Sequence, residues 1–217
     1  NHYLAKRIKF ISRFIKDNSV ILDIGCGTGI LAGALSALNI KSMVTGCDSS
    51  LEMLKIGKNN KEIKLICCNS QQLSYKNDSF DIIISIASFH HLNGEDSIFN
   101  TIKEMVRIAK KNAIIIIWDA NLLNPYWRFL FKKMPQDQEV KKVVALRKII
   151  NFIRKQNLVF NLEVYHSGWI PDFASKRMFP FWRTIEYIFE RMPIVKLFSA
   201  HYIMVINVIN KNLSYVE

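Results

Sequence analysis

Two hydrophobic periodicities alternate along this chain. Short and nearly continuous apolar runs are typical of strands that are buried on both faces of a sheet. The runs that we interpret as strands lie at residues 20–24, 41–48, 62–68, 80–86, 113–118, 157–165 and 201–209. Between them, apolar residues recur at the spacing of amphipathic helices. The predicted helices lie at residues 3–16, 30–38, 51–57, 94–111 and 140–153.

This alternation predicts an α/β fold, a Rossmann-like doubly wound sheet of seven strands with helices on both faces. Because no repeat or low-complexity linker interrupts it, we interpret residues 1–217 as a single domain. Right-handed crossovers place the carboxyl ends of the first strands along one edge of the sheet. We therefore expect the segments that follow residues 24, 48, 68 and 86 to form one site.

The first strand leads into a glycine-rich turn, Asp-Ile-Gly-Cys-Gly-Thr-Gly at residues 23–29. Glycines at alternate positions accept unusual φ angles and let a ligand approach the backbone. A dinucleotide-binding turn would carry its third glycine or alanine at Ile30, and a phosphate-binding P-loop would continue with Lys-Ser/Thr. Neither is present, so the turn predicts a nucleotide-type cofactor of another kind.

Asp48 ends the second predicted strand, at about the distance from the turn at which a doubly wound fold places an acid on a ribose. A carboxylate there can accept hydrogen bonds from both ribose hydroxyls. The alternative is that Asp48 caps the helix beginning near Ser50. Ser49 opens the next segment, and Met53 lies where it could flank the cofactor.

The glycine turn resembles the S-adenosylmethionine (SAM) loop of class I methyltransferases, which has this Asp-x-Gly-x-Gly-x-Gly spacing. The resemblance covers residues 3–118 well and the remainder weakly. It implies that SAM is the cofactor, that Asp23 helps to hold its methionyl amino group, and that the last strand is antiparallel. The expected cofactor-binding residues are Asp23, Gly25, Cys26, Gly27, Gly29, Asp48, Ser49, Met53, Asn69, Ser70, Gln71 and Ala87.

Asn69-Ser70 stands where this family commonly carries Asp-Ala, which reads the adenine ring. Asn69 departs from that pattern. Its amide oxygen can still accept a hydrogen bond from the adenine amine, but without the charge of a carboxylate. The sequence therefore predicts an adenine site with a weaker side-chain contact.

The fourth predicted strand ends in small residues followed by His90 and His91. In the resembled family this strand end passes under the sulfonium and faces the methyl acceptor. Either imidazole could act as a general base, with His90 nearer the strand end, or one histidine could simply position the loop. We expect an O, N or C nucleophile to displace S-adenosylhomocysteine directly from the methyl group, with no metal.

Residues 119–217 form the predicted acceptor-side half, with helical lid insertions near 121–135 and 168–199. Its first residues, Asp-Ala-Asn-Leu-Leu-Asn-Pro at 119–125, resemble in part a Glu-Pro-Asn-x-x-Asn-Pro stretch of some small-molecule methyltransferases. Residues 171–199 are dense in aromatic side chains, which indicates a substrate, partner or membrane surface, or else a buried mini-core. Apolar walls with a few cations suit an amphiphilic or anionic small molecule.

Lys and Arg number 30 against 18 Asp and Glu, a net charge of +12. Such an excess favours nucleic acid or an anionic membrane surface as a partner. Because the lysines are scattered and form no aromatic-interleaved block, we do not expect nucleic acid to bind. The predicted function is methyl transfer to a small-molecule, lipid-type or sugar-type acceptor. The alternatives are an RNA or protein methyltransferase, a nicotinamide oxidoreductase and a non-catalytic SAM-binding protein.

The four cysteines, Cys26, Cys47, Cys67 and Cys68, lack the spacing of a zinc site. We interpret them as buried, reduced thiols of a cytoplasmic protein. No apolar run approaches the ~20 residues that cross a bilayer. The first residues also lack the apolar core of a signal peptide. Peripheral contact with a membrane remains compatible with the sequence, and the sequence does not indicate an oligomeric state.

Overall fold

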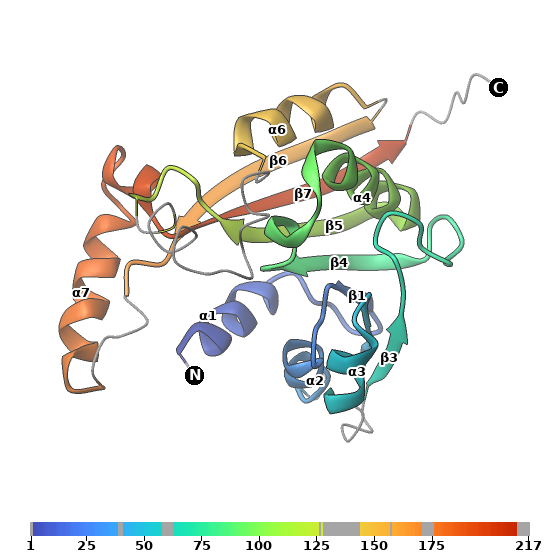
Figure 1. Cartoon of the computed structure of the whole chain (residues 1–217), viewed down its shortest axis with the longest axis horizontal. Coiled ribbons are helices and arrows are strands. Elements are labelled where there is room, and N and C mark those ends of the chain that lie inside the picture. The colour runs from blue at the N-terminus through green and yellow to red at the C-terminus, as the bar shows by residue number, and fades with distance from the viewer. Residues whose placement is uncertain are drawn as a thin grey trace.

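The computed structural model describes residues 2–38, 41–57, 63–125, 127, 144–156, 158–170 and 176–211. Its centre is a seven-stranded sheet in the order β3-β2-β1-β4-β5-β7-β6 (Figure 1). The strands are β1 Val20–Ile24, β2 Met43–Asp48, β3 Lys64–Cys67, β4 Phe80–Ile86, β5 Ala109–Ala120, β6 Leu158–Ser167 and β7 His201–Lys211. Neighbours among β1 to β5 pair in parallel, and β7 is antiparallel to β5 and β6. The predicted doubly wound sheet with an antiparallel last strand is confirmed.

Helices cover both faces of this sheet. They are α1 His2–Ile11, α2 Ile30–Ser36, α3 Leu51–Gly57, α4 Gly94–Ile108, α6 Leu146–Arg154 and α7 Phe179–Phe189, with 3₁₀ turns η1 Phe89–His91, η3 Lys176–Met178 and η4 Val195–Phe198. Successive strand residues point to opposite faces, so an all-apolar strand supplies two cores. In β5, Ile115 and Ile117 pack with α4 and α6, whereas Ile116 and Trp118 pack with α1 and α2.

The boundary between α4 and β5 differs from the prediction. The helix ends at Ile108, and Ala109 is already extended and paired with Phe80. Alanine at 109 satisfied the helical spacing of the apolar residues before it, so the pattern alone could not locate the change. The backbone at Asn112 is left-handed (φ 63°), and Lys110 pairs with Asp81 on β4 at 2.8 Å. Pairing with β4 therefore overrides the helical pattern.

The predicted end helices also differ in extent. α1 ends at Ile11 rather than at residue 16, and a turn follows in which the Phe14 N–H donates to the Ile11 carbonyl. α6 begins at Leu146, after the extended residue Ala145. Residues 140–143 of the predicted helix lie outside the described residues.

The two halves of the chain meet at the carboxyl end of β5. The buried side chain of Asn121 donates hydrogen bonds to the carbonyls of Leu197 and Ser199, at 2.7 and 2.9 Å. Asn124 donates to the Phe198 carbonyl at 2.7 Å. The stretch at 119–125 therefore fixes η4 and the start of β7, while α7 lies beyond the carboxyl edge of the sheet (Figure 1).

Candidate active site

A cavity of about 660 Å³ lies where β1, β2, β3 and β4 end, and we call it the β1–β4 pocket. Its volume is typical of a small-molecule or cofactor site. The sequence-predicted residues that line it are Gly25, Gly27, Asp48, Ser49, Met53, Asn69, Ser70, Gln71, Ala87 and His91. The lining residues that were not predicted are Ile24, Cys47, Cys68, Ser88 and Leu92. Asp23, Cys26, Gly29 and His90 do not line it.

The glycine turn is hydrogen-bonded to β2, because the N–H groups of Gly25 and Cys26 both donate to the Cys47 carbonyl, at 2.8 and 3.0 Å. At Gly25 (φ +73°) a Cβ would lie 2.2 Å from the Ser88 hydroxyl oxygen, so only glycine fits against the end of β4. At Gly27 (φ +55°) a Cβ would meet only the terminal methyl of Met53, at 3.4 Å. The backbone at Gly27 is therefore open for a ligand to approach.

Asp48 joins the turn to the start of α3. One carboxylate oxygen accepts a hydrogen bond from the Gly27 N–H at 2.7 Å, and the other accepts one from the Ser50 N–H at 2.8 Å. Ser50, not Asp48, caps α3, since its hydroxyl accepts from the Met53 N–H at 3.3 Å. Each Asp48 oxygen retains a second lone pair for a ribose hydroxyl. The ribose contact remains a prediction.

Asp23 lies beneath the turn and is only 2% exposed. No residue in the described part of the chain hydrogen-bonds its carboxylate. Burial, followed by the charge of Asp48, raises the pKa of Asp23 to about 7, and Arg7 opposes this shift. A buried carboxylate without a partner is unfavourable. A cationic ligand group would relieve this cost, so the residues present fit the ammonium end of SAM.

Cys26 and Gly29 shape the turn from outside the pocket. The Cys26 sulfur lies 2.8 Å from the position of a Cβ at Gly46, so it packs on β2, and Gly29 is the left-handed N-cap of α2. All four cysteines are free thiols. The expectation that all are buried is wrong: only Cys47 is buried, Cys26 and Cys68 are partly exposed, and Cys67 is exposed.

Asn69 forms the hydrogen bonds of a local turn after β3. Its side-chain oxygen accepts from the Gln71 N–H at 2.9 Å, and its carbonyl accepts from the Gln72 N–H. The neighbouring Ser70 hydroxyl lies 3.1 Å from that of Thr101 on α4. An asparagine oxygen has one lone pair left for an adenine amine. This geometry accounts for the side chain at 69, and the adenine contact remains a prediction.

The end of β4 carries backbone strain. Ala87 has a positive φ of 53°, which is uncommon for a residue with a Cβ, and its N–H donates to the Trp118 carbonyl at 2.8 Å. The turn η1 follows directly. His91 lines the β1–β4 pocket and its ring centroid lies 4.0 Å from that of His90. The strained residue thus directs both histidines toward one region.

Asp119, at the end of β5, holds His90 in place. One carboxylate oxygen accepts from the Phe89 N–H at 2.6 Å, and the other lies 2.6 Å from His90 Nδ1. Burial acts to raise the pKa of Asp119, but the hydrogen bond and charge of His90, with the Ala120 and Phe89 N–H groups, lower it overall. Asp119 therefore stays ionised and orients the imidazole. The sequence indicated Asp119 only as part of the 119–125 stretch.

Arg7 on α1 is a site residue that the sequence did not indicate. The charges of Asp23 and Asp119 both act on it, and its guanidinium carbon lies 5.9 Å from the centroid of the Trp118 ring. Burial lowers its pKa from the usual value, and its Nε has no hydrogen-bond partner. An arginine in a 3.6-residue pattern looks like a solvent-facing position. Only the fold shows that it faces the two acids.

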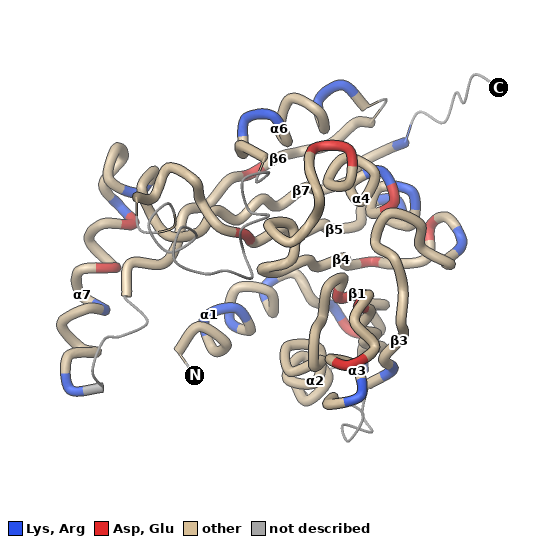
Figure 2. The backbone as a smooth tube through the Cα atoms, viewed as in Figure 1, with Lys and Arg blue, Asp and Glu red and all other residues tan. Residues whose placement is uncertain are grey.

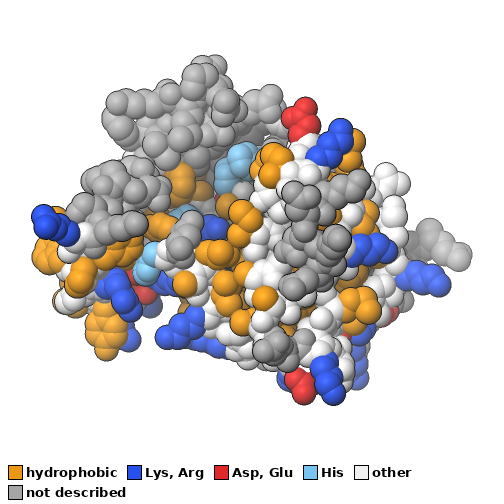
Figure 3. Space-filling view, turned by 90° about the horizontal axis from the view of Figure 1, so that it is seen from below, with side chains coloured by type: hydrophobic (Ala, Val, Ile, Leu, Met, Phe, Trp, Pro, Cys, Tyr) orange, Lys and Arg blue, Asp and Glu red, His pale blue; other side chains and the backbone are white. Residues whose placement is uncertain are grey.

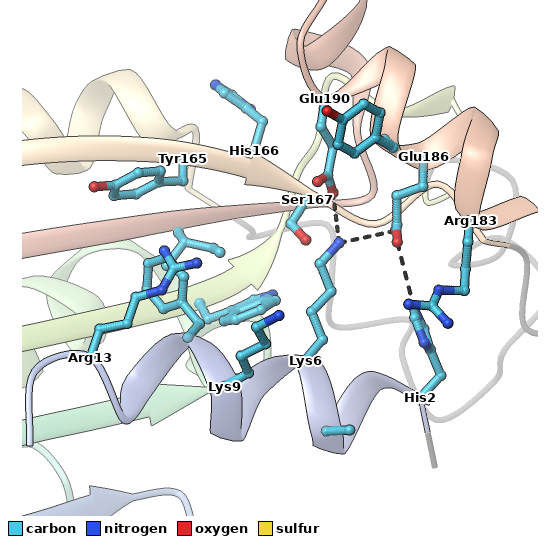
Figure 4. Close-up of a pocket in the computed structure, with 15 residues that line it drawn as sticks. His2, Lys6, Lys9, Arg13, Tyr165, His166, Ser167, Arg183, Glu186 and Glu190 are labelled. Atoms are coloured by element: carbon cyan, nitrogen blue, oxygen red, sulfur yellow. Dashed lines mark hydrogen bonds and ion pairs between the residues drawn. The ribbon is translucent and has the colours of Figure 1, made fainter.

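A second cavity, of about 510 Å³, lies between α1, α7 and the adjoining ends of β6 and β7 (Figure 4). We call it the α1–α7 cleft, and it shares no lining residue with the β1–β4 pocket. Lys6 reaches across it to Glu186 and Glu190, at 3.1 and 2.7 Å. Ser167 lines it with a buried hydroxyl that has no hydrogen-bond partner.

The predicted lid segments contribute nothing to the β1–β4 pocket within the described residues. Phe179 packs on His2, with ring centroids 5.7 Å apart, and Trp182 packs on Phe181. Residues 126, 128–143 and 171–175 of the acceptor side lie outside the described residues. Closure over the cofactor therefore remains a prediction. Among the described residues, no group of His, Cys, Asp and Glu is arranged to hold a metal ion.

Comparison with known proteins agrees with this geometry. Residues 22–117 match a family model described as a methyltransferase domain. A solved SAM-dependent methyltransferase from Archaeoglobus fulgidus superposes with a TM-score of 0.69, covering 95% of this chain and 93% of that one at 17% identity. At that identity the structural likeness shows the fold alone.

Relatives found by sequence include the following three. An uncharacterized protein of Methanocaldococcus jannaschii, MJ1252, is 30% identical over 79% of this chain. A tRNA (carboxymethyluridine(34)-5-O)-methyltransferase of Arabidopsis thaliana is 35% identical over 48% of the chain, and a malonyl-[acyl-carrier protein] O-methyltransferase of Priestia megaterium is 33% identical over 50%. The chain spans 65%, 24% and 39% of the lengths of these three proteins.

Proposed function

Residues 22–117 place this chain in the class I family of SAM-dependent methyltransferases, and we propose from that premise that it methylates an oxygen of a small anionic or amphiphilic acceptor. When bound, SAM supplies an activated methyl group that a nucleophile takes by direct displacement. The observation that carries the proposal is the β1–β4 pocket with the Asp119–His90 pair beside it. Cofactor site and proton acceptor meet at one edge of the sheet.

The chain's own residues divide the work at this edge. The Gly27 backbone and Asp48 would hold the adenosyl part of SAM, and Asp23 would pair with its ammonium group. The strained turn at Ala87 and Ser88 forms the wall nearest to the histidines. Holding both reactants in line is the main source of rate in such a displacement.

His90 acts as the general base in this proposal. Because Asp119 holds Nδ1, the proton of an acceptor hydroxyl would go to Nε2. A base whose other nitrogen is held by a buried carboxylate has a fixed tautomer and orientation. His91, which lines the β1–β4 pocket, shapes the cofactor side of the same turn.

A second candidate follows from the names of two relatives. Both are O-methyltransferases, and both names contain an acceptor that bears a carboxyl group, carboxymethyluridine in tRNA and malonyl in an acyl-carrier protein. A carboxylate oxygen needs no base, and the partly buried Arg7 supplies a charge that would attract it. Methylation of a carboxylate, including one on RNA, is therefore the alternative to methylation of a hydroxyl.

Methyl transfer from tritium-labelled SAM to a panel of acceptors tests the proposal. The panel contains hydroxylated and carboxylated small molecules, lipids, quinones, sugars and bulk tRNA. We expect label in a small anionic or amphiphilic molecule and none in tRNA. Label in tRNA alone would establish the alternative. Tight SAM binding with no transfer to any member would favour a non-catalytic SAM-binding role.

The reaction fits a cytoplasmic setting. The four thiols are free, and free thiols persist in the reducing cytoplasm. In the described part of the chain, no helix is long and apolar enough to cross a bilayer.

A further inference from the structure

The exposed apolar side chains of this protein are concentrated on α7 and the residues on either side of it, from η3 to η4. Half of the large exposed apolar side chains in the described chain lie here, and Ile194 is 74% exposed. They are Met178, Phe181, Tyr187, Ile188, Met192, Ile194, Leu197 and Phe198. Figure 3 shows apolar side chains interleaved with Lys and Arg at the end of the molecule that carries α7. We call these eight side chains the α7 patch.

α7 turns acidic side chains toward the protein and apolar side chains toward the outside, the reverse of an ordinary surface helix. Its acidic residues face the protein: Glu186 is only 6% exposed and accepts hydrogen bonds from Lys6 and from the Trp169 N–H. Glu190 accepts from Lys6 (Figure 4), and it also accepts from the Gly168 N–H. Phe181 and Ile188, two turns apart, are 56% and 48% exposed. A surface helix ordinarily turns its apolar face to the protein core. Here the apolar face is turned outward, so it suits contact with an apolar partner outside the protein.

The charge around the α7 patch is positive. Residues 176–211 contain only two acids, Glu186 and Glu190, and both are engaged with α1 or with backbone N–H groups. The exposed cations nearby are Arg177, Arg183 and Arg191, with Lys9 and Arg13 across the α1–α7 cleft. Figure 2 shows Lys and Arg along both α1 and α7. None of these five cations forms an ion pair with a described carboxylate.

We propose that the α7 patch docks this protein on an anionic lipid bilayer, with α7 lying in the plane of the surface. Apolar groups would enter the boundary between headgroups and acyl chains, and the arginines would contact lipid phosphates. Arg191 over the Tyr187 ring, 3.3 Å from its centroid, is a pair of the kind found at such a boundary. The inference does not depend on methyl transfer.

Lipid fits the α7 patch better than RNA does. Base stacking requires aromatic platforms, and three members of the patch, Phe181, Tyr187 and Phe198, carry such rings. The other five are aliphatic or thioether side chains with no flat face: Met178, Ile188, Met192, Ile194 and Leu197. Burial of such groups in hydrocarbon is favourable in proportion to the apolar area removed from water. The cations add an electrostatic attraction that requires anionic headgroups.

Flotation of the full chain with vesicles tests the proposal, without SAM present. Phosphatidylcholine vesicles containing phosphatidylglycerol should carry the protein, and phosphatidylcholine vesicles alone should not. Phe181→Ser with Ile188→Ser should lower partitioning at least ~tenfold, because both side chains leave the apolar face. The matched control is Met43→Ser with Ile56→Ser, two side chains that are each 67% exposed on other elements. It should change partitioning less than ~twofold.

The charge requirement has its own pair of variants. Arg183→Gln with Arg191→Gln should weaken partitioning roughly tenfold or more, since each cation near an anionic surface contributes to attraction. Lys55→Gln with Lys64→Gln removes the same charge from α3 and β3 and should have little effect. Calorimetric binding of S-adenosylhomocysteine confirms that every variant is folded, and it is measured separately. Loss of vesicle binding therefore says nothing against the proposed methyl transfer.

Several results would overturn the proposal. The first is failure to float with anionic vesicles, and the second is an equal loss in the Met43 and Ile56 control. Binding of poly(U) RNA that depends on Arg183 and Arg191, without vesicle binding, would make this a nucleic-acid surface. Self-association that Phe181→Ser with Ile188→Ser abolishes, again without vesicle binding, would assign the patch to a second copy of the chain.

Discussion

The two ends of the sheet's carboxyl edge are built in different ways. Where β1 to β4 end, backbone N–H groups join neighbouring segments of the sheet, as in the bonds from Gly25 and Cys26 to the Cys47 carbonyl, which lies 22 and 21 residues further along the chain. Where β5 to β7 end, side chains reach across long distances in the chain, as from Lys6 to Glu190 and from Asn121 to Leu197. The comparison teaches that the cofactor end is fixed by local sequence, whereas the acceptor end depends on the assembled fold.

Removing the buried charge at the cofactor end is expected to have the largest effect. Asp23→Asn should weaken SAM binding by roughly 10²–10³-fold, because the ligand ammonium would lose a desolvated ionic partner. Asp17→Asn, an exposed site, is the matched control and should change affinity less than ~twofold. Calorimetry measures both. Equal affinity of Asp23→Asn and the parent would remove Asp23 from the site.

The same residue predicts a pH dependence. The pKa of Asp23 rises from 3.8 to about 7 on folding, so between these values the folded state holds more protons than the unfolded state. The free energy of unfolding therefore falls as pH rises from about 4 to about 7. At pH ~8, Asp23→Asn should raise the unfolding free energy by up to ~4 kcal/mol. SAM affinity of the parent should increase over the same pH range. A Tm at pH ~8 that is unchanged or lower in Asp23→Asn would contradict this account.

At the junction of the two ends, His90→Gln tests the general base. Single-turnover transfer to a hydroxyl acceptor should slow by something like 10²–10⁴-fold, the usual contribution of a general base. SAM affinity should barely change, because His90 does not line the β1–β4 pocket. Asp119→Asn should slow methyl transfer and shift the pH profile of the transfer rate, because Asp119 contacts the imidazole of His90. If His90→Gln leaves this rate unaltered, His90 only positions the turn, and His91→Gln is the next variant.

These expectations show how much the sequence could supply. Nine of the predicted cofactor residues line the β1–β4 pocket, because a strand, a glycine turn and the acid that ends the next strand are close in sequence and fixed by local geometry. Arg7 and the role of Asp119 could not be predicted in this way. Each depends on elements that meet only when α1 and β5 pack beside β4.

Two further differences have the same cause. The sequence left Asp48 as either a ribose acceptor or the cap of the next helix. In the structure its carboxylate accepts from the Gly27 N–H and the Ser50 N–H, and it is Ser50 that caps α3. The aromatic segment at 171–199 could have been a surface or a mini-core. α7 is amphipathic either way, and periodicity does not show which face is turned inward.

A smaller effect is expected from removing the long-range hydrogen bonds of Asn121 at the acceptor end. Asn121→Ala removes hydrogen bonds to the Leu197 and Ser199 carbonyls and should lower the free energy of unfolding by ~1–3 kcal/mol. Asn210→Ala, on the exposed end of β7, should stay within ~0.5 kcal/mol of the parent. Urea unfolding compares the two. An equally small change at Asn121 would mean that η4 is held by other contacts.

The smallest expected effect concerns the proposed lid. Phe179→Ala with Trp182→Ala should raise the acceptor KM severalfold and leave SAM affinity near that of the parent, because neither residue lines the β1–β4 pocket. Phe160→Ala, which packs against the core below α6, controls for lost stability. Acceptor kinetics that respond equally to both changes would contradict a lid at α7.

The most direct test of the central claim is a calorimetric titration of the parent and of Asp48→Ala with SAM, and of the parent with NADH. The account predicts micromolar SAM binding in the parent and a loss of roughly 10- to 150-fold in Asp48→Ala, since hydrogen bonds to a charged group contribute ~1.5–3 kcal/mol. It also predicts that NADH binds more weakly than SAM. Asp48→Ala within ~threefold of the parent would contradict the ribose assignment, and NADH binding tighter than SAM would contradict the cofactor itself.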